Sequence, residues 1–213
     1  MKEIDLNTWG RRAHYKKFRD FEQPLFGMCA NVDTRRMYEH SKQLQVSFTV
    51  AIVFVLSKVA NSIPQFRHRI RGAAVVEHDL VHPSTTVLLA NDLFSFCTME
   101  YREPFRDFAR GAEASLSQVS QDPTLEDEPG RDDYLFMTSI PWVTFTSFQH
   151  PSPSRVGDSI PRFAWGKRQE VSGRLEMPLA VQGHHALMDG IHLGEFYGQV
   201  SEALQCPEET LGA

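Results

Sequence analysis

The chain has 213 residues and a mass of 24.3 kDa, a size that a single domain can accommodate. Apolar residues make up 41% and charged residues 23%, which excludes a disordered chain, and the net charge of −5 gives no indication of a nucleic-acid-binding protein. The longest apolar stretch, residues 50–56, is far shorter than the roughly 20 residues of a transmembrane helix. We therefore predict no nucleic-acid partner and no membrane association.

Targeting signals and cysteines give the expected compartment. Three of the first five residues are charged, and they lead into no apolar segment, so no signal peptide is predicted. The three cysteines, Cys29, Cys97 and Cys206, are odd in number and widely spaced, which fits neither a disulfide framework nor a zinc site. We expect a cytoplasmic protein without a bound metal ion.

The first third of the chain is mostly helical in pattern. Asn7-Thr8 and Asp33-Thr34 are suited to cap helices over residues 9–18 and 35–43. Between these helices we predict a loop over residues 21–27, which contains Pro24 and Gly27, and a short strand over residues 28–32. Residues 49–63 are apolar on most faces and stop before Pro64, which predicts a buried helix.

The middle of the chain changes to strand patterns. Residues 73–81, 85–89 and 93–99 are predicted strands, the first two joined by a turn at His82-Pro83. A helix follows over residues 104–119, and the polar, acidic residues 121–133 are predicted to form a solvated surface loop. Residues 134–148 indicate a strand that is interrupted at Pro141.

The last third of the chain completes an α+β pattern. Residues 163–167 and 174–183 are predicted strands with a turn at Ser172-Gly173, and a helix is predicted from Asp189-Gly190 to Leu204. We expect a central sheet with helices packed on it, in one domain over residues 1–213.

The segment His184-His185-Ala186-Leu187-Met188-Asp189-Gly190 carries the most chemical information. It places two histidines at a strand end, followed by an aspartate at a helix start. Asp189 can order the loop and accept backbone N–H groups at the helix terminus, and a buried carboxylate there would need a cationic partner. A structural pair of histidines fits the same pattern, whereas a metal site lacks a convincing set of further ligands.

This string is similar to the HHxxxDG motif of CoA-dependent acyltransferases. Residues 9–14 (WGRRAH) resemble the WxRRxH signature of type A chloramphenicol acetyltransferases, and residues 141–148 (PWVTFTSF) resemble their PWVxFxSF segment. The similarity continues through Lys167 and Arg174 to the histidines and spans Ile4 to about Leu204. The chain is therefore identified as resembling the chloramphenicol acetyltransferase family.

The resemblance implies a fold and a reaction. The family fold is a two-layer α/β sandwich with a mixed central sheet and helices packed on one face. It assembles as a homotrimer with an active site at each subunit interface. There the acetyl group passes directly from acetyl-CoA to a hydroxyl of chloramphenicol. The resemblance makes His185 the general base, a role that suits a side chain with an unperturbed pKa of about 6.5.

The resemblance also assigns supporting residues. Thr138 stands where the family has the serine that stabilises the oxyanion, and Asp189 and Arg11 match a buried ion pair. Lys167 and Arg168 are expected to meet CoA phosphates. The predicted apolar residues of the acceptor pocket are Phe18, Leu25, Phe26, Phe94, Phe96 and Phe136.

Several positions depart from the family pattern and keep alternatives open. Ala164 replaces a threonine that helps to hold a transition-state water, Arg168 replaces an aromatic residue, and Glu22 and Gln23 enter the pocket region. The same chemistry on another alcohol or an amine is therefore one alternative. A trimeric homologue that binds CoA or another ligand without catalysis is a second.

Overall fold

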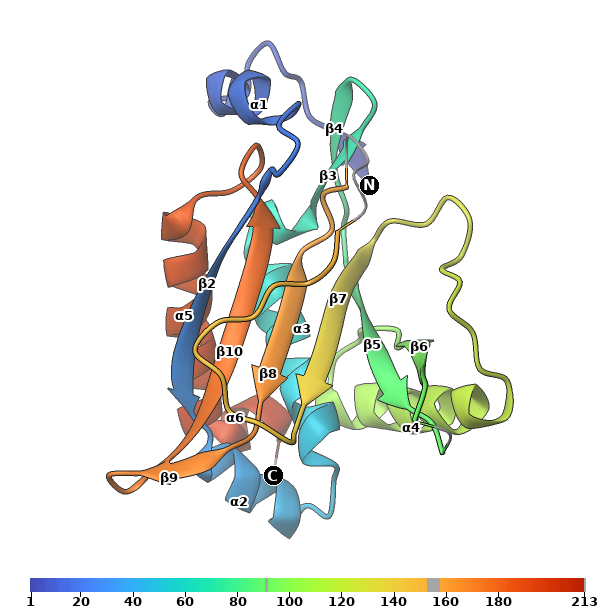
Figure 1. The fold of residues 1–213 in the computed structure, drawn as a ribbon, viewed down its shortest axis with the longest axis vertical. Coiled ribbons are helices and arrows are strands. Elements are labelled where there is room, and N and C mark those ends of the chain that lie inside the picture. The colour runs from blue at the N-terminus through green and yellow to red at the C-terminus, as the bar shows by residue number, and fades with distance from the viewer. Residues whose placement is uncertain (91, 153–157, 213) are drawn as a thin grey trace.

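A computed structural model describes residues 1–90, 92–152 and 158–212, and its centre is a seven-stranded mixed sheet (Figure 1). The pairs β5–β7 and β7–β8 are parallel, and the other pairs are antiparallel. In spatial order the strands are β2 (Leu25–Asp33), β10 (Arg174–His184), β8 (Arg162–Gly166), β7 (Tyr134–Ile140), β5 (His82–Leu88) and β6 (Phe94–Thr98), and β9 (Gln169–Val171) pairs with β10.

The helices form a layer behind this sheet (Figure 1). The layer consists of α2 (Arg35–Gln43), α3 (Phe48–Ser62), α4 (Phe105–Gln121), α5 (Gly190–Gln205) and α6 (Pro207–Leu211). A mixed sheet with a helical layer on one face confirms the predicted α+β fold. No helix among the described residues is long and apolar enough to cross a membrane.

Helix α1 (Arg12–Phe18) lies apart from this layer, at one end of the sheet (Figure 1). Its buried residue Tyr15 packs with Ala186 and Leu187, which follow β10. The same cluster includes Ile70 and Val75 from a small second sheet. That sheet is formed by β1 (Lys2–Glu3), β4 (Ala74–Glu77) and β3 (His68–Arg71), and the 3₁₀ helix η1 (Pro64–Arg67) leads into it.

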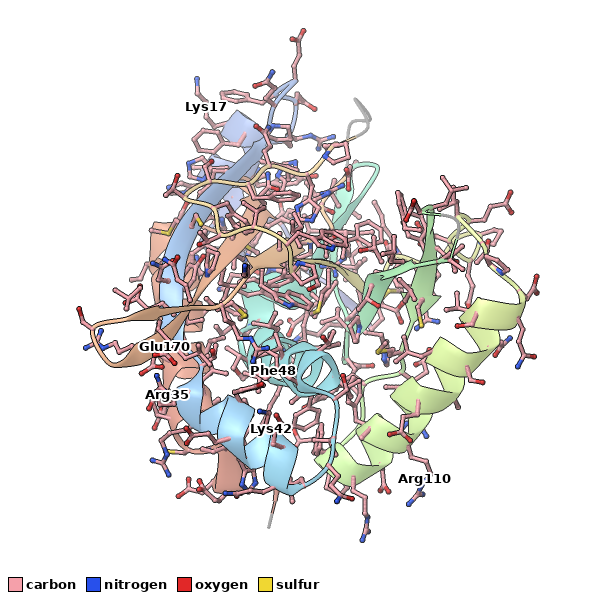
Figure 2. The ribbon with its side chains drawn as sticks, turned by 60° about the horizontal axis from the view of Figure 1, so that its bottom comes forward. Lys17, Arg35, Lys42, Phe48, Arg110 and Glu170 are labelled. Carbon is pink, nitrogen blue, oxygen red and sulfur yellow. The ribbon has the colours of Figure 1, made fainter. Side chains whose placement is uncertain are left out.

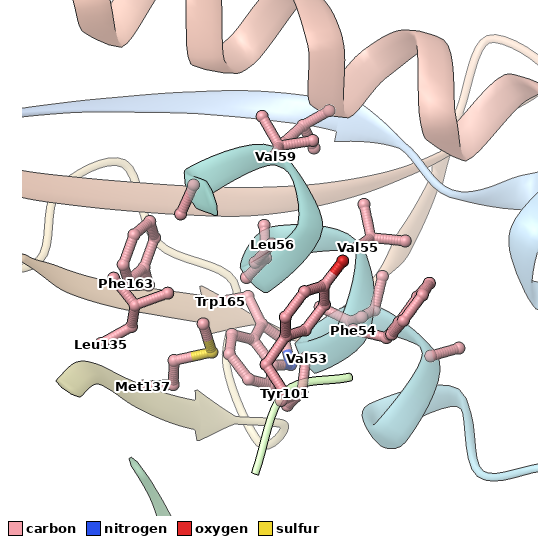
Figure 3. Close-up of a cluster of buried hydrophobic side chains, with 14 of the residues drawn as sticks. Val53, Phe54, Val55, Leu56, Val59, Tyr101, Leu135, Met137, Phe163 and Trp165 are labelled. Atoms are coloured by element: carbon pink, nitrogen blue, oxygen red, sulfur yellow. The ribbon is translucent and has the colours of Figure 1, made fainter. Parts of the chain in front are cut away.

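Helix α3 is the centre of the core. Ser47 caps it, with its Oγ accepting a hydrogen bond from the Val50 backbone N–H at 3.5 Å, and the helix ends just before Pro64, as predicted. Its buried side chains face sheet residues Leu135, Met137, Phe163 and Trp165 (Figure 3). Each fully buried side chain of this kind stabilises the fold by about 1.5–3 kcal/mol. Because strand side chains alternate, residues 136 and 138 of β7 face away from the helices.

The face of the sheet opposite the helices is crossed by the chain after β7. Residues 134–148 do not form one strand: β7 ends at Ile140, because Pro141 has no N–H group to continue the ladder. The segment that follows is held over the sheet by two hydrogen bonds. The Lys167 N–H donates to the Val143 carbonyl at 2.9 Å, and the His150 N–H donates to Gln182 Oε1 at 2.8 Å.

Two predicted loops are wrong in their positions. His82 and Pro83 do not form a turn but begin β5, and the Met99 N–H donates to the Pro83 carbonyl at 2.9 Å. Proline is tolerated there because its missing N–H is not required at the start of the strand. Similarly, the predicted loop over residues 21–27 ends early, since β2 begins at Leu25. Gly27 allows this pairing, because a Cβ atom there would lie only 2.9 Å from the Val181 carbonyl oxygen.

The short elements β1, β3, β9, η1 and α6 were not predicted. They span between two and five residues each, too few to show a period. One of them is anchored by an ion pair, in which Arg35 of α2 binds Glu170 of β9 (Figure 2).

Candidate active site

Strand β10 ends at His184, and this residue and the following His185 lie in different environments. The His184 side chain is 1% exposed, and its Nδ1 accepts the backbone N–H of Ala186 at 3.1 Å. Its proton is therefore on Nε2. Burial lowers the pKa of His184 to about 4, so the ring is neutral near pH 7. The next residue, His185, points the other way and has 36% of its side chain exposed.

The ring of His185 is held from two sides. Its Nδ1 lies 3.2 Å from the Met188 carbonyl oxygen and 3.2 Å from Asp189 Oδ1. Neither oxygen can donate, so we infer that Nδ1 carries the proton and that Nε2 keeps a free lone pair. The ring stacks on Phe18 at 4.2 Å between centroids and lies against Phe26 at 4.7 Å. The arrangement can accept a proton at Nε2 without reorienting the ring.

Arg11 fixes the loop that carries this histidine. We call residues 184–189 the histidine loop. The Arg11 guanidinium binds both carboxylate oxygens of Asp189, with Nη2 2.6 Å from Oδ1 and Nη1 against Oδ2. It also donates to loop carbonyls at 2.8–3.1 Å, those of His185, Ala186 and Met188. The hydrogen bond from Arg11 is the main cause that lowers the pKa of Asp189, so the carboxylate is ionised at neutral pH.

The loop is closed at its other end by the start of α5. The Asp189 backbone N–H donates to His192 Nδ1 at 2.9 Å, one turn into the helix. Just before the loop, a Cβ atom on Gly183 would overlap the Met188 sulfur, so glycine allows the Met188 side chain to pack directly on the strand. The chain itself thus determines the position of His185.

Thr138 lies in a separate cavity on the face of the sheet opposite the helices. This cavity, which we call the sheet cavity, has a volume of about 1160 Å³. Thr138 Oγ1 accepts a hydrogen bond from Thr86 Oγ1 at 3.3 Å. Three of the predicted pocket residues also line the cavity: Phe94, Phe96 and Phe136. The cavity therefore combines an apolar wall with a hydroxyl pair.

Within one chain, His185 and Thr138 are far apart. Thr138 is in register with Ala164, and Ala164 with Ala180, which lies five residues before His185 on β10. Five residues correspond to roughly 16 Å along a strand, and the two strands are a further ~10 Å apart across the sheet. A base and an oxyanion donor must both lie about 3 Å from the reacting group. The site residues therefore form two groups, one around His185 with Phe18, Leu25 and Phe26, and one around Thr138.

A family model described as chloramphenicol acetyltransferase matches residues 1–201. The chain belongs to the chloramphenicol acetyltransferase family. The chloramphenicol acetyltransferase of Klebsiella sp is 27% identical over 211 residues, which cover 99% of this chain and 95% of that protein. Chloramphenicol acetyltransferase 2 of Haemophilus influenzae is 27% identical over 195 residues, 91% of this chain and 92% of that protein. The names of these relatives support acetyl transfer as the class of reaction.

Solved structures agree with this assignment. One named chloramphenicol acetyltransferase superposes with a TM-score of 0.84 at 25% identity and covers 95% of this chain and 100% of its own length. A dihydrolipoamide acetyltransferase of Azotobacter vinelandii superposes with a TM-score of 0.67 at 15% identity, which shows a shared fold alone.

The two predicted CoA-binding residues of this family member differ in their environments. Lys167 is exposed directly after β8. Arg168 instead packs on aromatic rings, with its guanidinium carbon 4.0 Å from the Tyr38 ring centroid and 4.2 Å from that of Phe48. Its Nη1 atom is buried and has no hydrogen-bond partner among the described residues. Arg168 is thus held in place between the two aromatic rings.

Sequence reasoning missed several polar residues of the sheet cavity. Arg162 is 4% exposed and donates to Asp158 Oδ2 at 2.5 Å, and His150 Nδ1 lies 3.0 Å from Gln182 Oε1. Ser84 also lines the cavity. For Ser84 and Arg162 the signal was the alternation of side chains within strands, which becomes informative only when the pairing of the strands is known. His150 lies outside the strands and gave no such signal.

The acidic loop after α4 is part of the same cavity. Residues 121–133 were predicted to be merely solvated, but Glu126, Asp127 and Glu128 line the cavity as well as being exposed.

No group of three or more histidine, cysteine or acidic side chains that could hold a metal ion occurs in the described part of the chain.

Proposed function

We propose that this protein transfers an acetyl group from acetyl-CoA to the 3-hydroxyl of chloramphenicol, and so inactivates the antibiotic. The observation that carries the proposal is the His185 ring, whose Nδ1 is engaged by Met188 and Asp189 and whose Nε2 has no hydrogen-bond partner among the described residues. Membership of the family and the names of the relatives support the class of reaction.

The reaction follows from the chemistry of these side chains. Nε2 of His185 accepts the proton of the acceptor hydroxyl while that oxygen attacks the thioester carbonyl of acetyl-CoA. The tetrahedral oxyanion receives a hydrogen bond from Thr138 Oγ1. When the intermediate collapses, the bond to sulfur breaks and the CoA thiolate takes the proton from His185. No acyl-enzyme forms, and the imidazole returns to its starting state.

The separation of His185 from Thr138 supports a site shared between subunits. We propose a homotrimer in which His185 of one subunit faces the sheet cavity of the next. Large exposed apolar side chains are available for such contacts, including Trp142 at 66% and Met28 at 45% exposure.

The three cysteines are free, which fits the reducing cytoplasm that we propose as the compartment of the protein. Lys167 would meet a phosphate of the co-substrate.

The test is thiol release from acetyl-CoA with and without chloramphenicol, for the wild type and for His185→Gln. We expect chloramphenicol-dependent release that falls by about 10²–10⁴ in the variant, because glutamine cannot accept the proton. Urea unfolding of both proteins checks that the variant is folded. Near-normal turnover by His185→Gln would exclude the mechanism. CoA binding without any thiol release would instead favour an inactive homologue.

A second candidate keeps the chemistry and changes the acceptor. The polar groups of the sheet cavity favour it, because Arg162, His150 and Ser84 bring hydrogen-bonding groups to the wall of the cavity. A panel of alcohols and amines in the same assay distinguishes the two. A strong, saturable rate with chloramphenicol alone would exclude this alternative.

A further inference from the structure

Thr138 belongs to a row of residues that crosses the sheet. On one side it pairs with Ala164 of β8. On the other side β5 and β7 run parallel, with Thr85 opposite Met137, and the next two residues, Thr86 and Thr138, have hydroxyl oxygens 3.3 Å apart. Because paired residues point to the same face of a sheet, Ala164, Thr138 and Thr86 all face away from the helices.

The two hydroxyls of this row open onto the sheet cavity. Thr86 and Thr138 both line the cavity, and both are partly exposed. Ala164 is fully buried and brings no polar side-chain atom to the row. In the part of the chain that the structure describes, each hydroxyl forms one side-chain hydrogen bond, the one to the other. The side-chain partner of Thr138 therefore comes from β5.

The chain fixes the Thr138 oxygen more firmly than it fixes the direction of the proton. Strand β7 lies between β5 and β8, and a β-branched side chain is stiff about χ1, so the oxygen has a defined place. The proton, however, rotates about the Cβ–Oγ bond to suit its partners. A donor stabilises an oxyanion best when it already points to the place where the charge develops. The proton of Thr138 thus needs an orienting partner.

Two hydroxyls can form their hydrogen bond in either direction. If Thr138 donated to Thr86, its proton would point along the sheet and would not reach a reacting group in the cavity. If Thr86 donates, a lone pair of Thr138 is occupied and the Thr138 proton is available for a second partner. Negative charge on the oxyanion attracts that proton and so favours the second direction. Accepting a hydrogen bond also makes a hydroxyl a stronger donor, by about 10–30%.

We infer that Thr86 is a positioning residue, whose hydroxyl donates to Thr138 Oγ1 and directs the Thr138 proton to the oxyanion. This inference rests on the proposed acetyl transfer and adds a residue that acts through Thr138. No proton moves along the pair. Both threonines keep their protons, and the proton of the acceptor hydroxyl passes through His185 to the CoA thiolate.

The first test removes the hydroxyl of Thr86 at nearly constant volume. In Thr86→Val, kcat with chloramphenicol should fall about three- to tenfold, the effect of one hydrogen bond, with KM unchanged for both substrates. Thr86→Ser restores the donor and should recover most of kcat, and urea unfolding shows that both variants are folded. Wild-type kcat in Thr86→Val would overturn the inference. A higher KM for chloramphenicol with unchanged kcat would show direct binding of the acceptor, and would overturn it as well.

The neighbouring threonine provides a matched control. Thr85 pairs with Met137, whose side chain packs on the helices, so Thr85 faces away from the cavity. Thr85→Val makes the same chemical change one residue earlier and should keep the wild-type kcat. Equal losses in Thr85→Val and Thr86→Val would indicate a general disturbance of β5 and would overturn the positioning role.

A double-mutant cycle tests whether Thr86 acts through Thr138. In the Thr138→Ala background there is no hydroxyl to orient, so adding Thr86→Val should lower kcat no further than the roughly 10²-fold loss of Thr138→Ala alone. Losses that multiply, to about 300- to 1000-fold, would show that Thr86 acts independently on the substrate and would overturn the relay.

The same measurements separate this inference from the proposed function. If the wild type releases no thiol in response to chloramphenicol, the proposed function fails and the inference fails with it. If the wild type is active and Thr138→Ala keeps its kcat, Thr138 is not the oxyanion donor. If Thr138→Ala is slow and Thr86→Val is normal, the proposed function stands and only the positioning role of Thr86 is wrong.

Discussion

The histidine loop and the sheet cavity satisfy their polar groups in different ways. In the loop, Arg11 alone binds three backbone carbonyls and both oxygens of Asp189. In the cavity, Ser84 Oγ has no hydrogen-bond partner within the described part of the chain, and the Thr138 hydroxyl has only that of Thr86. The loop is thus organised by its own chain, whereas the cavity leaves hydrogen bonds for a ligand or a neighbouring subunit.

This difference separates folding from function. A substitution in the loop removes intramolecular bonds, so its first effect is on stability and on the position of His185. A substitution of a cavity group that has few partners in the chain, such as Ser84 or Thr138, should instead act mainly on turnover or binding. Measuring unfolding and turnover on the same variants tests the comparison directly.

The largest effect is expected for Arg11→Ala. It leaves the Asp189 carboxylate without its cation and releases three carbonyls, so the free energy of unfolding should fall by about 2–4 kcal/mol, with a loss of turnover. Urea denaturation and thiol release measure the two quantities. Arg12→Ala, an exposed neighbour on α1, is the control and should change neither. An Arg11→Ala protein of wild-type stability would contradict the bracing role of Arg11.

Thr138→Ala should show the opposite profile. We expect kcat to fall by about 10²-fold, the usual effect of removing one oxyanion donor. The urea midpoint should change little, because among the described residues the Thr138 side chain forms one hydrogen bond, of 3.3 Å, to Thr86. Thr138→Ser keeps the hydroxyl and should retain most of kcat. Equal rates for the alanine and serine variants would exclude Thr138 as the donor.

The smallest effect concerns pH. Burial lowers the pKa of His184 to about 4, so between pH ~6.5 and pH ~4 the unfolded chain binds a proton at this residue that the folded chain does not. Stability from this residue is therefore complete above pH ~6.5 and decreases as the pH falls to ~4. The free energy of unfolding of His184→Gln should decrease less over that interval. Parallel pH profiles for the two proteins would show that His184 is not the cause.

The sequence predicted the fold class and the long elements well, and it predicted spatial neighbours less well. The helix over residues 49–63 and the long last strand have clear apolar patterns, and both agree with the structure to within one or two residues. Arg11 and Asp189 were paired only through the family motif, because nothing local connects residues 178 positions apart. Ser84 and Asp127 gave no signal, since their shared cavity depends on how β5, β6 and β7 pair and on where the acidic loop lies.

Helix α1 also bears on how the protein should be handled. The helix lies against the histidine loop, and the amino group of Met1 forms an ion pair with Asp79. The chain end that follows α6 lies at the opposite end of the molecule (Figure 1). An affinity tag or a fluorescent fusion partner therefore belongs after α6, where it leaves both the ion pair and His185 undisturbed.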